Sequence, residues 1–393
     1  MIDVDVIPHF LKYMGSKREI LDDIRSAVDS LHVDSDCFCD LFAGTAVVSY
    51  AMSDCYNVIS NDIQRFSSVF AKTYFGTYDQ YDAYKVIDCI LTSAQEHVCH
   101  LIQSYPYLKD LCSYSDDMGF DCFMTLEAAQ QDLLNQEMNE VYSLFTRCYS
   151  GTYWSLEQCM WIDALRMVAE DYKDESIYYA ILSSIIYAMS YSSQSTGHFA
   201  QFRKVTLENY KNILFYRKKN VVELFAKKLT EVLTLRKDTN NHECACLSMD
   251  YRLCLEYIPS GAIVYADPPY SNVHYSRFYH AIETLVRYDY PVLKYTGRYR
   301  SDRHQSPFDQ AQNVRKAFAS LFDGVKTSQS HLILSYSDNG MLTPEEILTI
   351  GTQILGIEYE YNMFSKEYSH MKMGRSDDYK MDVNELLITF KRL

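Results

Sequence analysis

A short apolar run that ends at an acid, two prolines and a tyrosine constrains this chain more than any other feature. Residues 262–266, with the sequence Ala-Ile-Val-Tyr-Ala, precede Asp267, Pro268, Pro269 and Tyr270. The run predicts a buried strand because it is brief, partly β-branched and closed by turn residues. Neither proline can extend a strand ladder, since each has a fixed φ and no N–H group. The chain therefore leaves a sheet rigidly at Asp267.

This corner offers two hydrogen-bond acceptors beside a flat ring. Ligands of an open α/β sheet bind just beyond the carboxyl ends of its strands, where Asp267 and Tyr270 would lie. The Asp267 carboxylate and the Pro268 carbonyl suit the exocyclic NH2 group of a planar base, and Tyr270 could stack on that base. The alternative is a strand that ends in a proline turn with one solvated acid. These four residues alone do not decide between the two interpretations.

Composition restricts the class of protein. A chain of 393 residues can bury one large core, or a core with an inserted domain. No apolar run is long enough to span a membrane, and residues 1–10 lack the pattern of a secretory signal. The 12 cysteines form no CxxC pair, so we expect reduced thiols in a cytoplasm and no metal site. The net charge of −15 argues mildly against a nucleic-acid partner, unless a local basic face overrides it.

Two neighbouring strand ends favour a nucleotide cofactor. Residues 37–46 predict a strand and a small-residue turn that contains Phe42 and Gly44, and a second strand ends at Asp62. A glycine lets backbone approach a ligand, and an acid roughly 20 residues further on commonly holds ribose hydroxyls. The glycine fingerprint is incomplete, because Ala46 stands at its second glycine position. Asp62 could instead cap a helix.

Two more charged residues, Lys17 and Asp250, could line such a pocket. Ser16 and Glu19 have the spacing of a capping box, which predicts a helix that begins beside Lys17. Its free N–H groups and the Lys17 ammonium could receive a carboxylate, although an ordinary capped surface helix is the alternative. A strand predicted from the alternating residues 242–246 ends at residues 248–251, which include Asp250. Asp250 could accept a hydrogen bond from the amino group of a bound purine, or it could cap the helix that follows.

Residues 71–242 predict a helical insertion between two halves of a sheet domain. Helical patterns cover residues 81–105, 125–149, 157–172 and 176–191, and no strand pattern there is convincing. In the flanks, strands alternate with helices, so we expect a mostly parallel sheet.

Three segments indicate where nucleic acid would bind. Residues 191–199 form a polar loop rich in side chains that bond base edges and phosphates, and a basic stretch over residues 203–237 follows it. Basic residues alternate with tyrosines over residues 294–304, a pattern that can grip phosphates and stack bases. The alternatives are a solvated helix face for the basic stretch and a mobile surface loop for the last segment. The candidates from these segments are Ser195, His198, Arg203, Lys204, Arg300 and Arg303.

In their order along the chain, these features resemble the class alpha (D12-type), Dam-like N6-adenine-specific DNA methyltransferases. The matching segments are residues 12–17, 40–44, 61–62, 267–270 and 383–388, in the order cofactor motif, recognition domain, catalytic motif. Their order and spacing are more specific than any one segment. The departure is Ala46 in place of a glycine, which could narrow the cofactor pocket.

The resemblance implies a Rossmann-like, S-adenosylmethionine-dependent methyltransferase sheet with a large, mainly helical inserted domain. Residues 1–70 and 243–393 would form the catalytic domain, and residues 71–242 the target-recognition domain. The cofactor S-adenosylmethionine would be contacted or enclosed by Tyr13, Lys17, Phe42, Gly44, Asp62, Asp250 and Asp267. The catalytic residues would be Asp267, Pro268, Pro269 and Tyr270, with no metal.

The implied activity is site-specific methyl transfer to the N6 amine of a flipped adenine in double-stranded DNA. One alternative is an amino-methyltransferase that acts on RNA or on another base. Another is a non-catalytic nucleic-acid-binding protein that keeps the fold. The resemblance further implies a bacterial, phage or mobile-element origin, a cytoplasmic location without a membrane, and a cognate restriction endonuclease as a further partner.

Overall fold

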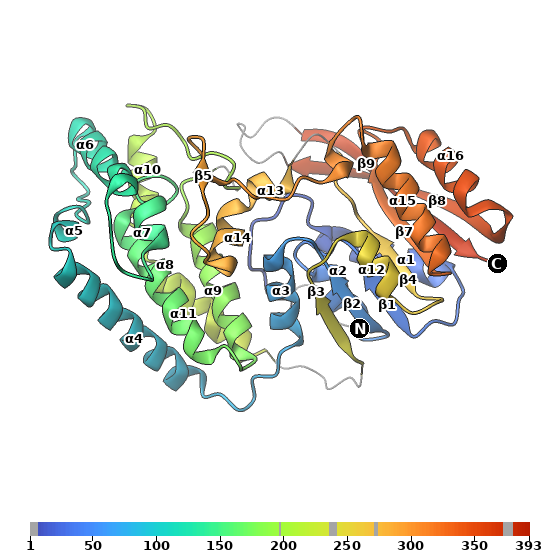
Figure 1. Cartoon of the computed structure of the whole chain (residues 1–393), viewed down its shortest axis with the longest axis horizontal. Helices are drawn as coiled ribbons and strands as arrows, with labels where there is room; N and C mark the ends of the chain where they lie inside the picture. The colour runs from blue at the N-terminus through green and yellow to red at the C-terminus, as the bar shows by residue number, and fades with distance from the viewer. Residues whose placement is uncertain (1–6, 196–197, 236–241, 271–273, 372–379) are drawn as a thin grey trace.

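The computed structural model describes residues 7–195, 198–235, 242–270, 274–371 and 380–393. In Figure 1 a body of helices occupies one side of the molecule, and a sheet with its covering helices occupies the other. None of the helices in these ranges combines the length and the apolar character that crossing a membrane requires.

A seven-stranded sheet with the order β3-β2-β1-β4-β7-β9-β8 forms the centre of the side opposite the helical body. Neighbouring strands from β3 through β7 are parallel, whereas β9 is antiparallel to both β7 and β8. The predicted α/β class with a mostly parallel sheet is therefore confirmed. The strands are β1 Cys37–Asp40, β2 Asn57–Asn61, β3 Cys244–Leu247, β4 Ile263–Ala266, β7 His331–Ser337, β8 Tyr359–Met371 and β9 Lys380–Arg392.

Alternate residues of the central strands supply two cores, one on each face of the sheet. Phe38 and Tyr265 belong to one core, while Cys39 and Val264 belong to the other. This period of two, with apolar residues at every position, is what a strand covered on both faces requires. The first face is covered by α1 Leu21–Ser30, α2 Val47–Met52 and α3 Arg65–Phe75. The second is covered by α12 Tyr251–Tyr257, α15 Val314–Thr327 and α16 Pro344–Leu355.

The strand order changes direction at β1, and this switch point positions the site. The chain runs outward from β1 to β2 and β3, then returns to β4 on the other side of β1. The register pairs Asp40 with Tyr265, so both strands end at the same level. A crevice beyond such strand ends is the usual ligand site of a doubly wound sheet.

The insertion is helical, as predicted, but one predicted helix was wrong. The expected helices at residues 81–105, 157–172 and 176–191 correspond to α4, α8 with η4, and α9. The pattern at residues 125–149 is instead split between α6 and α7. The carboxylate of Asp163 accepts hydrogen bonds from the N–H groups of Phe145 (2.9 Å) and Thr146 (2.7 Å), so a distant side chain caps a new helix there. The bounds are α4 Ala83–Ser104, α5 Tyr107–Asp110, α6 Phe120–Gln131, η3 Asp132–Asn135, α7 Leu144–Cys148, α8 Leu156–Ala169, η4 Glu170–Tyr172, α9 Ile177–Ser192, α10 Tyr210–Arg217 and α11 Val221–Leu233.

A segment that follows residues 267–270, the predicted catalytic tetrapeptide, packs against the helical body (Figure 1). It comprises α13 Tyr275–Phe278, α14 His280–Arg287 and the small hairpin of β5 Leu293–Lys294 and β6 Tyr299–Arg300. The Arg298 guanidinium donates to the carbonyl oxygens of Cys148 and Gln131, and the Tyr288 hydroxyl donates to Asp163 at 2.5 Å. These contacts join part of the predicted catalytic range 243–393 to the insertion, and the domain boundaries stay a prediction.

Three short helical turns complete the fold. They are η2 Lys17–Ile20, η5 Pro307–Asp309 and η6 Gly356–Glu358. The first two line the crevice at the switch point.

Candidate functional site

A cleft of about 1020 Å³, part of it open to solvent, lies beyond the carboxyl ends of β1, β2 and β4. Such a concave, partly apolar space suits a ligand of nucleoside size. The structure brings all ten residues of the predicted cofactor and catalytic sets to this cleft, while the role of each stays a prediction. They are Tyr13, Lys17, Phe42, Gly44, Asp62, Asp250, Asp267, Pro268, Pro269 and Tyr270.

Backbone hydrogen bonds hold Asp62 against the glycine turn. The Gly44 N–H donates to Oδ2 of Asp62 at 3.0 Å, and the Gln64 N–H donates to Oδ1 at 2.8 Å. Burial raises the pKa of Asp62, and these N–H groups oppose the rise. Since each carboxylate oxygen can accept more than one hydrogen bond, Asp62 keeps acceptor capacity for a ligand.

Gly44 stands where a side chain would not fit. Its φ is +51°, and a Cβ atom there would lie 3.1 Å from the ring of Tyr13. The turn thus uses both properties of glycine, its freedom at positive φ and its lack of a side chain.

Two tyrosines that we did not predict hold the N-terminal segment in place. Tyr13 stacks on Tyr279 with ring centroids 4.7 Å apart and lies 5.8 Å from Tyr275. The Met14 N–H donates to the Tyr279 hydroxyl at 2.8 Å. Residues 275 and 279 are four apart, so their spacing already indicated one helix face beside the catalytic tetrapeptide.

The predicted capping box at Ser16 and Glu19 was wrong. Within the described residues, the Ser16 side chain makes no capping hydrogen bond, and residues 17–20 form a 3-10 turn before α1 begins at Leu21. The Lys17 side chain turns inward and is only 6% exposed. Its ammonium therefore meets protein carboxylates rather than solvent.

A buried cluster of charges surrounds Asp267, the first residue of the predicted catalytic tetrapeptide. Lys17 Nζ lies 3.2 Å from Oδ1 of Asp267 and forms a second ion pair with Oε1 of Glu385. The Ser335 hydroxyl donates to the same Glu385 oxygen at 2.8 Å. Burial raises the pKa of Asp267 to about 6; the Lys17 ammonium opposes this rise, and the Glu385 carboxylate adds to it. We missed Ser335 and Glu385, although residues 383–388 carried part of the resemblance.

Neighbouring side chains pack against the ring of Tyr270. The rings of Tyr270 and Tyr336 meet edge to face with centroids 5.9 Å apart, and Lys17 Nζ lies 6.0 Å from the Tyr270 centroid. The Tyr270 carbonyl accepts a hydrogen bond from the Met341 N–H at 2.9 Å. Residues 271–273 lie outside the described residues, which resume at residue 274.

Phe42 and Asp250 line the other end of the cleft. The Phe42 ring packs 5.5 Å from Phe308 and 5.7 Å from Tyr251, measured between centroids. Asp250 caps α12 by accepting from the Arg252 N–H at 3.0 Å, and it also accepts from the Arg252 guanidinium. The capping alternative for Asp250 is therefore confirmed, and its contact with a purine stays a prediction.

The predicted polar loop at residues 191–199 lies directly against α13. The His198 ring stacks on Phe278 with centroids 4.2 Å apart, and the Phe199 N–H donates to the Phe278 carbonyl at 2.7 Å. Ser195 forms an isolated bridge with Phe202, and residues 196–197 lie outside the described ranges. The loop thus reaches the cleft side of the insertion.

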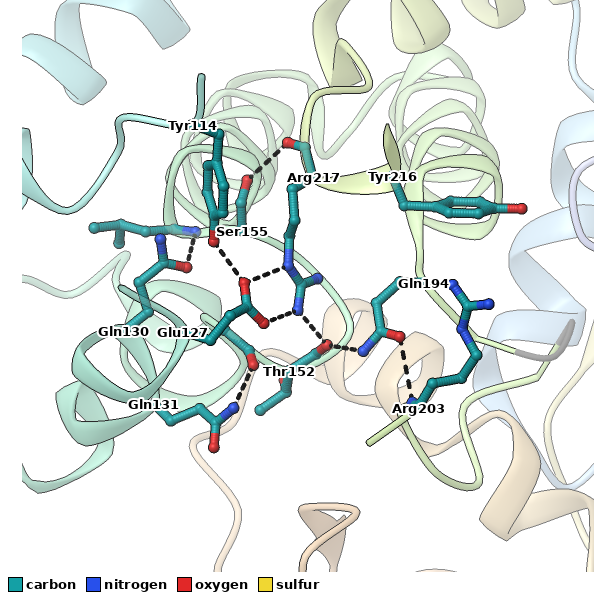
Figure 2. A network of polar contacts seen from close by, with 12 residues as sticks. Tyr114, Glu127, Gln130, Gln131, Thr152, Ser155, Gln194, Arg203, Tyr216 and Arg217 are labelled. Carbon is teal, nitrogen blue, oxygen red and sulfur yellow. Dashed lines mark hydrogen bonds and ion pairs between the residues drawn. The ribbon is translucent and has the colours of Figure 1, made fainter. Parts of the chain in front are cut away.

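The basic stretch does not form one solvent-facing surface. Arg203 donates to Oδ1 of Asn212 at 2.7 Å, with its guanidinium 5.7 Å from the Tyr216 centroid, whereas Lys204 is exposed. Arg217 is buried and paired with Glu127 (Figure 2). Among the described residues of the stretch, only some charges therefore face solvent.

Arg300 and Arg303 differ in how accessible their guanidinium groups are to a phosphate. Only 1% of the Arg300 side chain is exposed, and its guanidinium is bound by Asp289 and Asp302. This burial argues against the predicted phosphate contact, so Arg300 is not kept in the proposed interface. Arg303 is half-buried and donates to the Ser276 hydroxyl at 3.4 Å, beside the cleft.

Comparison with known proteins agrees with this geometry. A model of the D12 class N6 adenine-specific DNA methyltransferase family matches residues 13–333. Type II methyltransferase M.FokI of Planomicrobium okeanokoites is 25% identical over 385 residues, and Modification methylase StsI of Streptococcus sanguinis is 27% identical over 353 residues. Type II methyltransferase M.NlaIII of Neisseria lactamica is 22% identical over 379 residues.

The lengths of these relatives differ. The aligned region covers 96% of this chain and 51% of M.FokI, 86% of this chain and 46% of StsI, and 94% of both this chain and M.NlaIII. The chain thus spans about half the length of the first two relatives.

Proposed function

Because this chain belongs to the D12 class N6 adenine-specific DNA methyltransferase family, we propose that it methylates the N6 amine of adenine at a specific site in duplex DNA. The observation that carries the proposal is the position of Asp267, Pro268 and Tyr270, which share one cleft with Gly44 and Asp62 at the switch point of the sheet. An acceptor pair for an amine and a nucleotide-type pocket are the two halves that this reaction needs.

The residues of the cleft fit S-adenosylmethionine, which supplies a methyl group on a sulfonium centre when it is bound. Asp62 offers acceptors for ribose hydroxyls beside the space that a Cβ atom at Gly44 would fill. The rings of Phe42, Tyr251 and Phe308 provide an apolar wall for a purine.

At the catalytic corner, Asp267 and the Pro268 carbonyl would accept the two hydrogens of the adenine amine. The amine lone pair is conjugated into the ring, so two acceptors that favour a pyramidal nitrogen release it for attack. As N6 takes the methyl group that bound S-adenosylmethionine would supply, the Asp267 carboxylate would accept the surplus proton of N6. Tyr270 would stack on the extruded base and offset an unstacking cost of about a few kcal/mol. Positioning and preorganised acceptors supply the remaining rate enhancement.

The decisive experiment compares Asp267→Ala with the wild-type protein. We expect labelled methyl groups to enter adenine of duplex DNA, and the substitution to lower the rate by about 100-fold or more, because an acceptor aimed at the reacting amine is lost. Asp323→Ala, at an exposed acid on α15, is the matched control and should leave the rate unchanged.

Two other outcomes would contradict the proposal. Label in RNA alone, or in another base, would favour an amino-methyltransferase of different specificity. A failure of the wild-type protein to bind S-adenosylmethionine in a calorimeter would favour a nucleic-acid binder that keeps the fold without the activity.

We further propose that residues 71–242 select the DNA site, with Ser195, His198, Arg203, Lys204 and Arg303 at the interface. The support is the contact between His198 and Phe278, which brings the polar loop beside the segment that follows the catalytic corner. Exchanging this insertion for that of a relative should change the methylated sequence, as read by sequencing that detects methylated adenine.

The names of two relatives support a biological setting. M.FokI is called a Type II methyltransferase and StsI a Modification methylase, both from bacteria. We propose that this protein works in a bacterial cytoplasm and protects DNA against a cognate restriction endonuclease. DNA from cells that express it should resist an endonuclease that cuts at the methylated sequence, and continued cleavage there would contradict this role.

A further inference from the structure

We propose that Glu385 is a positioning residue for methyl transfer. It shares the Lys17 ammonium with one oxygen of Asp267, so that the ammonium does not neutralise the carboxylate that accepts the adenine amine. This inference rests on the proposed function, and it names a residue that neither the tetrapeptide nor the glycine turn contains.

Three separate parts of the chain meet to build this arrangement. Lys17 comes from η2, Asp267 follows β4, and Glu385 lies on β9. Strand β7 runs between β4 and β9 in the sheet, with Ala266 opposite Leu334 and Ser337 opposite Glu385. The register therefore fixes the separation of the two carboxylates, and Lys17 Nζ bridges them.

The three side chains of this bridge are largely buried. The exposed fractions of the Lys17, Asp267 and Glu385 side chains are 6%, 19% and 7%. Burial by itself would lower the pKa of Lys17, but Asp267 and Glu385 hold it well above its usual range, so the ammonium stays charged. Ser335 donates a further hydrogen bond to the oxygen of Glu385 that faces Lys17.

One cation between two carboxylates leaves a net negative charge at the corner. Without the charge of Glu385, the ammonium would be drawn fully to Asp267 and would neutralise the group that must accept the amine hydrogens. Asp267 would then be a weaker base and a poorer acceptor. Glu385 thus keeps Asp267 basic.

Other titratable groups also face Asp267. Burial raises the pKa values of the surrounding tyrosines, so they stay neutral over the range of an assay, whereas the pKa of Asp40 is raised to about 7. Asp40→Asn is therefore made in both backgrounds, to separate its titration from that of Asp267. The groups concerned are Tyr13, Asp40, Tyr265, Tyr270 and Tyr275.

The experiment uses the full chain with Glu385→Gln, Glu385→Asp and, as the matched control, Glu360→Gln. Glu360 lies on the neighbouring strand β8, with 58% of its side chain exposed. The readouts are kcat against pH, the calorimetric affinity for S-adenosylmethionine, and the Asp267 pKa from carboxyl 13C NMR of the protein alone. These readouts separate a positioning role from a merely structural one.

We expect Glu385→Gln to lower kcat by about 10- to 100-fold, the range that slight misplacement at a reacting centre produces. It should also move the acidic limb of the profile and the Asp267 pKa to lower pH, with affinity for S-adenosylmethionine unchanged. Glu385→Asp keeps the charge and should restore the limb, and Glu360→Gln should change nothing.

An unchanged Asp267 pKa in Glu385→Gln, or an equal loss of rate at every pH, would overturn the inference. Failure of the wild-type protein to transfer methyl groups would instead defeat the proposed function. In that case the NMR titration still decides whether Glu385 controls Asp267.

Discussion

The protonation of Asp267 follows from its place at the end of a buried strand. Its pKa of about 6 means that the carboxylate is ionised at neutral pH but takes up a proton in mild acid. In the proposed mechanism the ionised carboxylate takes up the surplus proton of the adenine amine, so we expect the methyl-transfer rate to fall about tenfold per pH unit below about pH 6. Single-turnover rates at a series of pH values test this. A rate that stayed level down to about pH 5, as an ordinary aspartate would allow, would contradict it.

Ala46 adopts a backbone conformation in this turn that favours glycine. It caps α2 with a φ of +56°, and it is fully buried. Positive φ favours glycine, because a Cβ atom crowds the backbone there. The sequence indicated a missing glycine at this position, and the structure shows that the chain keeps the backbone conformation despite the alanine.

Residues whose place in the cleft follows from a local pattern could be predicted. Gly44, Asp62 and Asp267 each follow a strand, and parallel strands bring their ends to one edge, so three distant motifs meet in one cleft. Glu385 could not be found in this way, because its partner Lys17 lies 368 residues away and the pairing depends on register and side-chain direction. A local pattern carries no information about such a pair.

At the scale of helices, a buried ion pair joins α6 to α10 in the insertion, as Figure 2 shows. The Arg217 guanidinium donates to both oxygens of Glu127, at 2.8 Å and 2.6 Å, and to the Thr152 carbonyl at 2.8 Å. Gln194 donates to the same Thr152 carbonyl at 2.6 Å and accepts from the Arg203 N–H at 3.3 Å. The network thus connects the packing of these helices to the segment that carries Arg203.

We expect Glu127→Ala to lower the free energy of unfolding by about 3–5 kcal/mol, because it leaves the buried Arg217 without a counter-charge. Urea unfolding measures this change. The matched control is Asp116→Ala, which removes the largely exposed partner of Lys218 in the same region and should cost about 1 kcal/mol or less. Equal small losses in both variants would show that the buried pair contributes no more than the exposed one.

Ion pairs of this kind also explain why the predicted basic segments offer fewer free charges than their sequences suggest. Arg217, Lys228 and Arg300 are as basic in the sequence as Lys204, yet each of them pairs with a carboxylate of the fold. The sequence reports the sign of a charge, while its availability depends on which acid the tertiary structure places opposite it. Charge runs therefore predict an interface less reliably than strand ends predict a pocket.

Over the whole molecule, a net charge of −15 must coexist with the proposed binding of a polyanion. In the proposed interface, binding then depends on a few exposed cations, and Lys204 is an exposed cation of this set. We expect Lys204→Ala to weaken duplex binding and to reduce the slope of log affinity against log salt by about 1, the effect of losing one phosphate contact.

Affinities at several salt concentrations measure this slope. Lys85→Ala is the control, since that side chain is 84% exposed on α4, the outer helix of the insertion in Figure 1. An identical slope for both variants would place the DNA away from residue 204.

The position of β9 has a consequence for how the protein is made. This strand follows the other six along the sequence, yet it is inserted between β7 and β8 rather than added at an edge. A growing polypeptide therefore cannot complete this sheet until Arg392 has left the ribosome. Until then β8 lacks the strand with which it pairs. Because Glu385 arrives on the same strand, the charge cluster beside Asp267 forms only after β9 has been synthesised, so translation products truncated before β9 would carry the glycine turn and the tetrapeptide without it.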